Sequence, residues 1–283
     1  MNLKSALFLF LSILTIDSVL ADRLQVFVSV LPQQYFVKQV GGERIDVEAL
    51  VLPGQSPATY NPTTKQIQRL ASARLFFRTG VPYEDAWLKR IQSTNPEMMI
   101  VDARDNIPLL EMHGHDDHHH GDNSDPHIWT SPANVIIQTE QIRDQLSLID
   151  PAGKNYYAEN ARVFIHQLQE LDDAIRAKLA PLKQRSFMVF HPSWGYFAGH
   201  YGLEQISVEK EGKEPGARSI SRLIEEAREE QIKVIFIQPQ FSQRIAQTIA
   251  HAIDGRVVVI DPLAENYLEN LQFVSDQLIE HLQ

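Results

Sequence analysis

Short apolar runs alternate with amphipathic segments along most of the chain. Runs with the length and bounding turn residues of buried strands occur at 25–30, 47–52, 75–78, 99–102, 187–190, 205–208, 234–237 and 257–260. Helical spacing of apolar residues is found at 33–40, 63–71, 132–148, 219–230, 243–252 and 267–282. Strand–helix alternation of this kind is typical of parallel sheets with helices on their faces. The pattern therefore predicts an α/β protein with two α/β lobes.

One amphipathic segment, midway between the two groups of strands, is much longer than the others. It starts at Asp150 and Pro151, a typical helix cap followed by a proline in the first turn. Apolar residues then recur every three or four positions, at Tyr157, Ala161, Phe164, Leu168, Leu171, Ile175 and Leu179. Ending near Pro181, a helix of roughly 30 residues would be ~45 Å long. We expect one long rigid helix joining the lobes, with an ordinary surface helix as the alternative.

These patterns divide the chain into four parts, the first of which is typical of a secretory signal. A positive charge at Lys4 precedes an apolar run, and a small residue, Ala21, ends the segment. The run is shorter than the ~20 apolar residues of a membrane-spanning helix, so we expect export to the periplasm with cleavage near Ala21. The expected parts are a signal peptide (1–21), an N-terminal lobe (22–149), a connecting helix (150–181) and a C-terminal lobe (182–283).

Composition and charge exclude several classes of protein. Of the 283 residues, 43% are hydrophobic and 22% are charged, which is ordinary for a globular protein and excludes a disordered one. The formal net charge of −10 argues against a nucleic-acid partner. The chain has no cysteine, which excludes disulfides, thiolate zinc sites, cysteine nucleophiles and an acylated N-terminal cysteine.

One stretch, 113–122, departs from this ordinary composition. It contains the histidines His113, His115, His118, His119 and His120, interleaved with aspartate and glycine. Histidine-rich tracts of this kind are typical of metal binding. We expect a flexible loop that binds accessory ions, with a merely solvated loop as the alternative.

Three further side chains are candidates for an ordered metal site. His191 and Asp261 each directly follow a predicted strand, and His127 lies in a loop. In open α/β folds, ligands bind beyond the carboxyl ends of the strands. Imidazole and carboxylate donors suit zinc, with manganese and iron as weaker alternatives. Taken singly, each residue is weak evidence, because a lone histidine near an aromatic residue is more often an ordinary core side chain.

These features together resemble the metal-specific, zinc-uptake class of periplasmic solute-binding proteins of ABC transporters. The similarity extends over 24–282 and is carried by the segments 125–127, 191–197, 209–215, 238–242 and 261–263. It implies two lobes joined by a rigid helix, with one metal ion in the cleft between them. It also implies that His127, His191 and Asp261 are metal ligands.

One position departs from the pattern of that family. The family reads Pro-His-x-Tyr-Glu-Pro where this chain reads Pro-Ala-Thr-Tyr-Asn-Pro at 57–62. The resemblance implies that the histidine of this segment is a further metal ligand, the first along the chain. Alanine has no side-chain lone pair, so Ala58 cannot take that role. Water, a histidine of the 113–122 loop or a nearby carboxylate such as Glu84 would then complete the coordination.

The resemblance implies a binding protein rather than an enzyme. It would capture Zn²⁺, in preference to Mn²⁺ or Fe²⁺, and deliver it to an ABC-type membrane permease. We expect a monomer that touches the membrane complex only peripherally. A degenerate or Mn/Fe-preferring paralogue and a metal-storage or adhesin protein remain open. A zinc hydrolase is disfavoured, because the sequence has no His-Glu-x-x-His motif and no nucleophile elbow.

Overall fold

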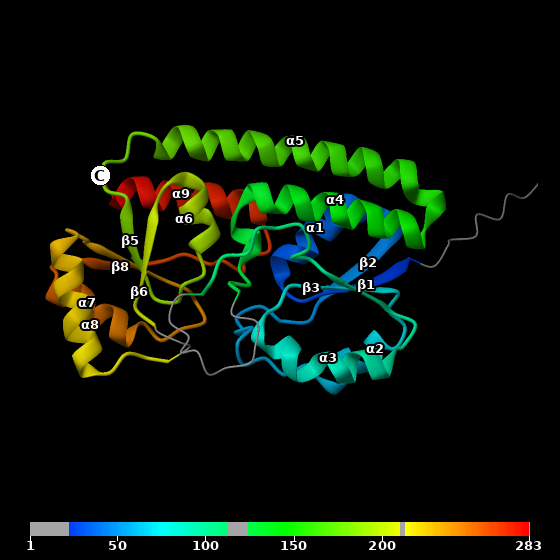
Figure 1. The fold of residues 1–283 in the computed structure, drawn as a ribbon, viewed down its shortest axis with the longest axis horizontal. Coiled ribbons are helices and arrows are strands. Elements are labelled where there is room, and N and C mark those ends of the chain that lie inside the picture. Colours follow the sequence, from blue (N-terminus) through cyan, green and yellow to red (C-terminus); the bar gives the residue numbers. More distant parts are fainter. Residues whose placement is uncertain (1–22, 113–123, 210–212, 283) are drawn as a thin grey trace, which may run out of the picture.

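The computed structural model describes residues 23–112, 124–209 and 213–282, which form two α/β lobes side by side (Figure 1). Each lobe is built on a four-stranded parallel sheet, which confirms the predicted fold class. The strands of the N-terminal sheet, in the order β2-β1-β3-β4, are β1 (Leu24–Val28), β2 (Ile45–Ala49), β3 (Leu75–Arg78) and β4 (Met99–Asp102). Those of the C-terminal sheet, in the order β6-β5-β7-β8, are β5 (Ser186–Val189), β6 (Glu204–Ser207), β7 (Val234–Ile237) and β8 (Arg256–Val259).

The two sheets share one topology. In each lobe the first strand lies inside the sheet, the second pairs on one side of it and the third on the other. Val26 of β1 is thus in register with Val47 of β2 and with Leu75 of β3. The strand order therefore reverses at β1/β3 and at β5/β7, and the loops at the carboxyl ends of these strands diverge to leave a crevice.

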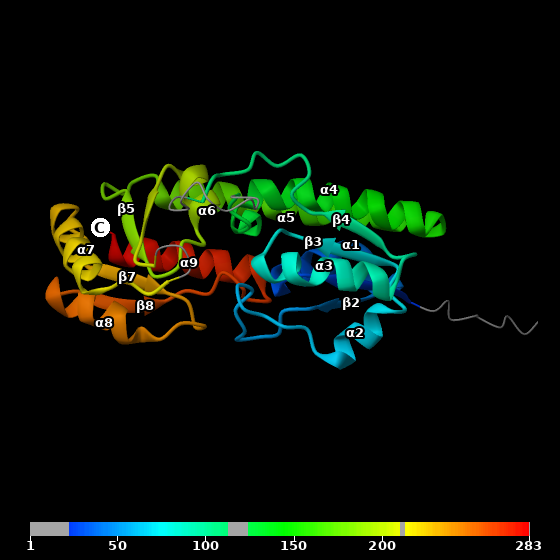
Figure 2. The same ribbon diagram turned by 60° about the horizontal axis from the view of Figure 1, so that its bottom comes forward.

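Helices cover both faces of each sheet (Figures 1 and 2). Those of the first lobe and its crossover are α1 (Leu31–Gly41), α2 (Thr64–Leu70), α3 (Pro82–Thr94) and α4 (Pro132–Ile149). The second lobe has α6 (Gly195–Tyr201), α7 (Ala217–Glu229), α8 (Gln243–Ala252) and α9 (Tyr267–His281). None of the helices in the described ranges is long and apolar enough to cross a membrane.

Two of these helices, α3 and α6, were not expected from the sequence. Only Tyr83, Glu84 and Ile91 of α3 are buried, and one of these is a carboxylate, so no continuous apolar stripe marks this helix. Helix α6 is seven residues long, too short for the 3.6-residue period to be recognised.

The connecting helix α5 (Lys154–Leu179) runs along both lobes (Figure 1). It packs against α1 and α4 of the N-terminal lobe and against α9 of the C-terminal lobe. Its buried residues are the predicted stripe: Tyr157, Ala161, Phe164, Leu168, Leu171, Ile175 and Leu179. The stripe belongs to one hydrophobic core that extends through both lobes.

An aromatic junction lies at the centre of this shared core. Phe36 of α1 meets Phe164 of α5 with ring centroids 6.1 Å apart, and meets Tyr267 of α9 edge-on at 4.8 Å. All three rings are buried, with at most 2% of their surface exposed. Since α1 belongs to one lobe and α9 to the other, any change in the angle between the lobes would have to break these contacts.

Removing bulk from the stripe tests whether α5 is part of the core. Leu168→Ala leaves a cavity at a fully buried position and should lower the free energy of unfolding by about 2–5 kcal/mol. Val163→Ala on the same helix, at a position 44% exposed, should change it by less than about 0.5 kcal/mol. Denaturant unfolding followed by circular dichroism measures both. Equal changes in the free energy of unfolding would mean that the buried stripe contributes no more to stability than an exposed position of α5.

Candidate metal centre

Two of the predicted ligands, His127 and His191, lie together. Their ring centroids are 5.2 Å apart and the ring planes are inclined at 76°. His127 comes from the N-terminal lobe, immediately before the short 3₁₀ turn Ile128–Thr130 that leads into α4. His191 comes from the C-terminal lobe, two residues after β5 ends. The pair thus brings one imidazole from each lobe to a common point.

A buried carboxylate fixes each imidazole. His127 Nδ1 lies 2.6 Å from Asp125 Oδ1, and His191 Nδ1 lies 2.8 Å from Glu209 Oε2. An ionised carboxylate can only accept a hydrogen bond, so in the neutral form of each ring Nδ1 carries the proton and Nε2 keeps its lone pair. A histidine whose second nitrogen binds a carboxylate is the usual arrangement around a protein-bound metal ion. Both rings are therefore prepared to donate Nε2 to a cation.

The loop after β7 holds the backbone and the ring of His191. The Gln238 side chain accepts a hydrogen bond from the His191 backbone N at 3.2 Å and donates one to the His191 carbonyl at 2.7 Å. Phe241 stacks on the imidazole, with centroids 5.3 Å apart and planes within 23°. Because β5 and β7 are neighbours at the point where strand order reverses, these contacts place His191 in the crevice of the C-terminal sheet.

The segment around His127 is tied to the C-terminal lobe. The hydroxyl of Tyr196, from α6, donates to the Asp125 carbonyl at 2.9 Å. The buried Trp129 indole N–H donates to the Pro262 carbonyl at 2.7 Å. Pro262 directly follows Asp261, so the loops that carry His127 and Asp261 are joined by a direct hydrogen bond.

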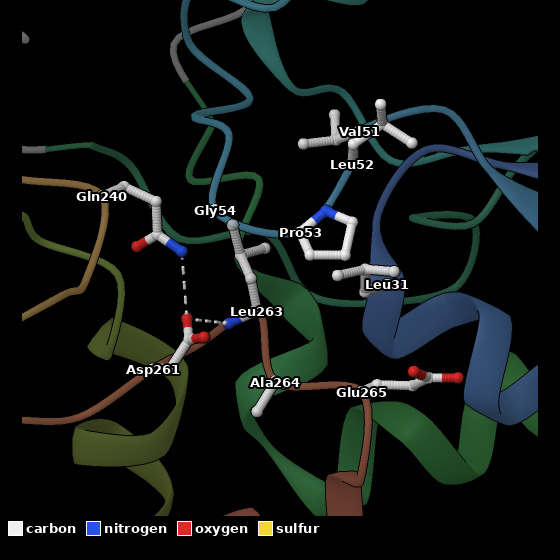
Figure 3. A pocket seen from close by; sticks show the side chains of 10 residues that line it. All are labelled: Leu31, Val51, Leu52, Pro53, Gly54, Gln240, Asp261, Leu263, Ala264 and Glu265. Carbon is white, nitrogen blue, oxygen red and sulfur yellow. Dashed lines mark hydrogen bonds between the residues drawn. The ribbon is translucent and has the colours of Figure 1, made fainter.

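Asp261 itself lies near the end of β8 and points into a cavity between the lobes (Figure 3). Its Oδ1 accepts a hydrogen bond from the Leu263 backbone N at 2.9 Å and a longer one from Gln240 Nε2 at 3.3 Å. Across residues 23–112, 124–209 and 213–282, no group of three or more histidine, aspartate or glutamate side chains is arranged to hold a metal ion. The structure thus brings the two histidines together, but it does not join Asp261 to them in such a group.

Glu84, considered from the sequence as a fourth ligand, is otherwise engaged. It is fully buried in the first turn of α3, where it accepts hydrogen bonds from the Ser29 hydroxyl and from the backbone N–H groups of Thr79 and Gly80. Burial raises the pKa of this carboxyl, and the three hydrogen bonds offset part of the effect. This corrects the expectation: Glu84 ties the loops after β1 and β3 together and has no accessible surface for a metal ion.

The remaining accessory candidates are the five histidines of the 113–122 stretch. His113, His115, His118, His119 and His120 lie outside the described residues. The residues on either side are paired: Glu111 forms an antiparallel bridge with Ser124, and the Asp125 backbone N donates to the Leu110 carbonyl at 2.7 Å. The described residues that flank this segment therefore lie close in sequence and space to Asp125, the carboxylate that holds His127.

Sequence reasoning missed the residues that orient the two imidazoles. Asp125 belongs to the segment 125–127 that carries the family resemblance, and its position two residues before His127 is the signal that could have identified it. Glu209 is 18 positions from His191, and only the parallel pairing of β5 with β6 brings them together. Gln238 and Phe241 follow β7, the other neighbour of β5, and only this strand pairing brings them into contact with His191.

The hydrogen-bonding pattern predicts which tautomer each histidine adopts. In two-bond ¹⁵N–¹H spectra at alkaline pH, where the rings are neutral, both His127 and His191 should show a protonated Nδ1 and an unprotonated Nε2. His251, exposed on α8, should show the ordinary mixture of tautomers and serves as the internal control. A dominant Nε2–H form at His127 or His191 would contradict the pairing with Asp125 or Glu209.

Comparison with known proteins places the chain in a family. The family model described as "Zinc-uptake complex component A periplasmic" matches residues 26–281. The zinc-binding lipoprotein AdcA of Streptococcus pneumoniae (strain R6) is 31% identical over 254 residues, which cover 85% of this chain and 50% of AdcA. The high-affinity zinc uptake system protein ZnuA of Bacillus subtilis is 30% identical over 255 residues, covering 86% of this chain and 79% of ZnuA. The chain thus spans about half the length of the first curated relatives it matches.

Solved structures agree with this assignment. A crystal structure of ZnuA superimposes with a TM-score of 0.88 and 36% sequence identity, covering 93% of this chain and all of that one. Zinc-bound AdcA from Streptococcus pneumoniae gives a TM-score of 0.77 at 28% identity, covering 92% of this chain and 58% of AdcA. Together with the family match over 26–281, these similarities confirm the resemblance seen in the sequence: the chain belongs to the family of periplasmic A components of zinc-uptake complexes.

Proposed function

We propose that this protein binds Zn²⁺ between its lobes and delivers it to an ABC-type membrane permease, with no chemical conversion. The observation that carries the proposal is the pair of imidazoles, one from each lobe, each bound through Nδ1 to a buried carboxylate. Two neutral imidazole nitrogens suit zinc better than manganese, which prefers oxygen donors. The relatives whose names include zinc binding or zinc uptake support the same cargo.

We propose that Nε2 of His127 and of His191 are the first two ligands and that Asp261 is the third. Asp261 follows β8 at the same edge of the sheet as His191, and the Trp129–Pro262 hydrogen bond holds its loop against that of His127. Its bond to Gln240, at 3.3 Å, is long, so exchanging it for a metal contact costs little. Water or a donor from outside the described residues would complete a tetrahedron.

The location and partner follow from the same proposal. Residues 1–21 would direct export, with cleavage near Ala21, and the mature monomer would meet its permease at the periplasmic face of the membrane. The shared core across α5 favours delivery without wide closure of the lobes, because the junction of Phe36, Phe164 and Tyr267 has no spare volume for a hinge.

Zinc titration with variants tests this assignment. Isothermal titration should give one tight site per chain, which His127→Ala and His191→Ala each abolish. Asp125→Asn and Glu209→Gln keep the shape of the carboxylates but not their charge, and should weaken binding about 10- to 100-fold. His251→Ala and Glu229→Gln, both at exposed positions, should leave it unchanged.

Other outcomes of the titration would favour the other functions. Tight binding that survives both histidine variants but is lost on deletion of 113–122 would indicate a storage or adhesin protein that binds metal through that segment. Stronger binding of Mn²⁺ or Fe²⁺ than of Zn²⁺ would indicate a paralogue with another cargo. Turnover of ester or amide substrates by the zinc-loaded protein would indicate a hydrolase.

Restoring an imidazole at position 58 should tighten zinc binding. Ala58 is exposed, in the turn where the Pro57 carbonyl accepts a hydrogen bond from the Tyr83 backbone N at 3.3 Å, so the new side chain has room. In Ala58→His a protein nitrogen would replace a water ligand and slow zinc dissociation. Competition with a chromophoric chelator measures the difference. No gain, even after deletion of 113–122, would mean that position 58 does not face the metal.

A further inference from the structure

The two carboxylates that hold the imidazoles are themselves held in different ways. Glu209 and His191 belong to the same lobe, and the pairing of β5 with β6 brings them together. Asp125 belongs to the N-terminal lobe, but it lies against the first turn of α6 in the C-terminal lobe. His127 is thus oriented by Asp125, and Asp125 is in contact with the opposite lobe.

Gly195, the first residue of α6, lets the Asp125 carboxylate come close. A Cβ atom on Gly195 would lie 2.9 Å from Asp125 Oδ2, well inside van der Waals contact. The next nearest atoms, on the side chains of Gln205 and Leu110, would be 3.7 Å away, which is an ordinary contact. The carboxylate is not free to move aside, because its Oδ1 accepts a hydrogen bond from the His127 backbone N at 2.9 Å and lies 2.6 Å from Nδ1 of that residue. A methyl group at position 195 would therefore act on the carboxylate that orients His127.

The Tyr196 hydroxyl joins the two chain segments that meet at Asp125. It accepts a hydrogen bond from the Leu110 backbone N at 3.0 Å and donates its proton to the Asp125 carbonyl at 2.9 Å. The Asp125 backbone N donates to the Leu110 carbonyl at 2.7 Å, which closes a ring of hydrogen bonds. Asp125 is 4% exposed and Tyr196 6%, so loss of the hydroxyl would leave the buried Asp125 carbonyl without this partner. The phenol thus fixes the backbone of Asp125 to α6.

Helix α6 is a firm support because it is anchored at both ends. At its start, the Trp194 backbone N donates to Gln205 Oε1, on β6, at 2.7 Å. At its end, the Tyr201 hydroxyl donates to Asp172 Oδ1, on α5, at 2.8 Å. A helix held both to its own sheet and to the connecting helix fixes the position of Asp125 relative to the C-terminal lobe.

We propose that Gly195 and Tyr196 are positioning residues of the metal centre, through which the C-terminal lobe sets the zinc affinity of a ligand on the N-terminal lobe. The inference rests on the proposed zinc-binding function and deepens it: Nε2 of His127 is aimed at the metal only while Asp125 is seated on α6. Neither residue is itself a ligand, since Gly195 has no side chain and the Tyr196 hydroxyl bonds to backbone groups.

Two glycines of α6 form a matched pair for the test. Gly199, four residues after Gly195, is exposed, and nothing lies within 4 Å of the place where its Cβ would be. In competition with a chelator, Gly195→Ala should weaken zinc binding about 10- to 100-fold, because it displaces the carboxylate that orients His127. Gly199→Ala should leave zinc binding unchanged. Denaturant unfolding should show that both variants fold, because the new methyl group at position 195 meets the end of a side chain and no backbone atom.

A second variant and a spectroscopic measurement separate positioning from folding. Tyr196→Phe removes only the hydroxyl and should weaken zinc binding about 3- to 10-fold, the effect of one hydrogen bond. Tyr156→Phe, at a position 41% exposed on α5, should leave it unchanged. In the metal-free protein at alkaline pH, both Gly195→Ala and Tyr196→Phe should shift the ring ¹⁵N resonances of His127 toward an ordinary mixture of tautomers. Those of His191, which is held within its own lobe, should stay in place.

Zinc binding as tight as in the parent protein, in either Gly195→Ala or Tyr196→Phe, would overturn this inference and leave the zinc function standing. Weaker binding with unchanged His127 resonances would also overturn it, because Asp125 would still hold the ring. If Gly195→Ala does not fold, Tyr196→Phe decides by the same two measurements. Absence of tight zinc binding in the parent protein would overturn the proposed function itself.

Discussion

The contact between Phe36, Phe164 and Tyr267 determines how the rest of the molecule is arranged. These rings join α1, α5 and α9, and so connect the N-terminal lobe, the long helix and the C-terminal lobe through one packed core. Because a packed interior has almost no free volume, the lobes cannot rotate without opening voids in it. The spacing of the cleft is therefore set by packing.

A cleft of fixed width requires that its binding groups be positioned in advance. Both imidazoles meet this requirement, since a carboxylate holds each Nδ1. Asp125 also accepts a hydrogen bond from the His127 backbone N, and Gln238 donates one to the His191 carbonyl. The entropy of ordering these side chains is lost during folding, so a cation that binds there does not have to supply it. Asp261 is less constrained, with one short and one long hydrogen bond, and it borders a cavity with mixed apolar and acidic walls. The rigid half of the centre and the adaptable half thus lie on different loops.

The sequence was most informative where a property repeats along the chain. The apolar stripe of α5 was predicted residue by residue because spacings of three and four recur over the whole helix. The strands were predicted to within three residues at each end, and β3, β4 and β7 with their exact bounds, since each is a short apolar run bounded by turn residues. Helix α3 was missed because few of its residues are buried and one of them is the charged Glu84.

The candidate centre was predictable only in part. His127, His191 and Asp261 were picked out because they lie in loops at or near strand ends and because the chain resembles a known family. The pairing of His191 with Glu209 and the stacking of Phe241 depend on the lateral order of β6, β5 and β7, which no local pattern reveals. The same holds for the burial of Glu84, whose carboxylate takes its hydrogen bonds from three separate backbone and side-chain groups.

Anomalous scattering from crystals soaked with Zn²⁺ tests whether the two imidazoles bind the metal, because it locates the ion and its ligands in one measurement. We predict one strong peak ~2.0–2.1 Å from Nε2 of both His127 and His191, with Asp125 and Glu209 still bound to the opposite ring nitrogens. A strong peak bound at Nδ1 of either histidine, or a tight zinc site that involves neither imidazole, would contradict it.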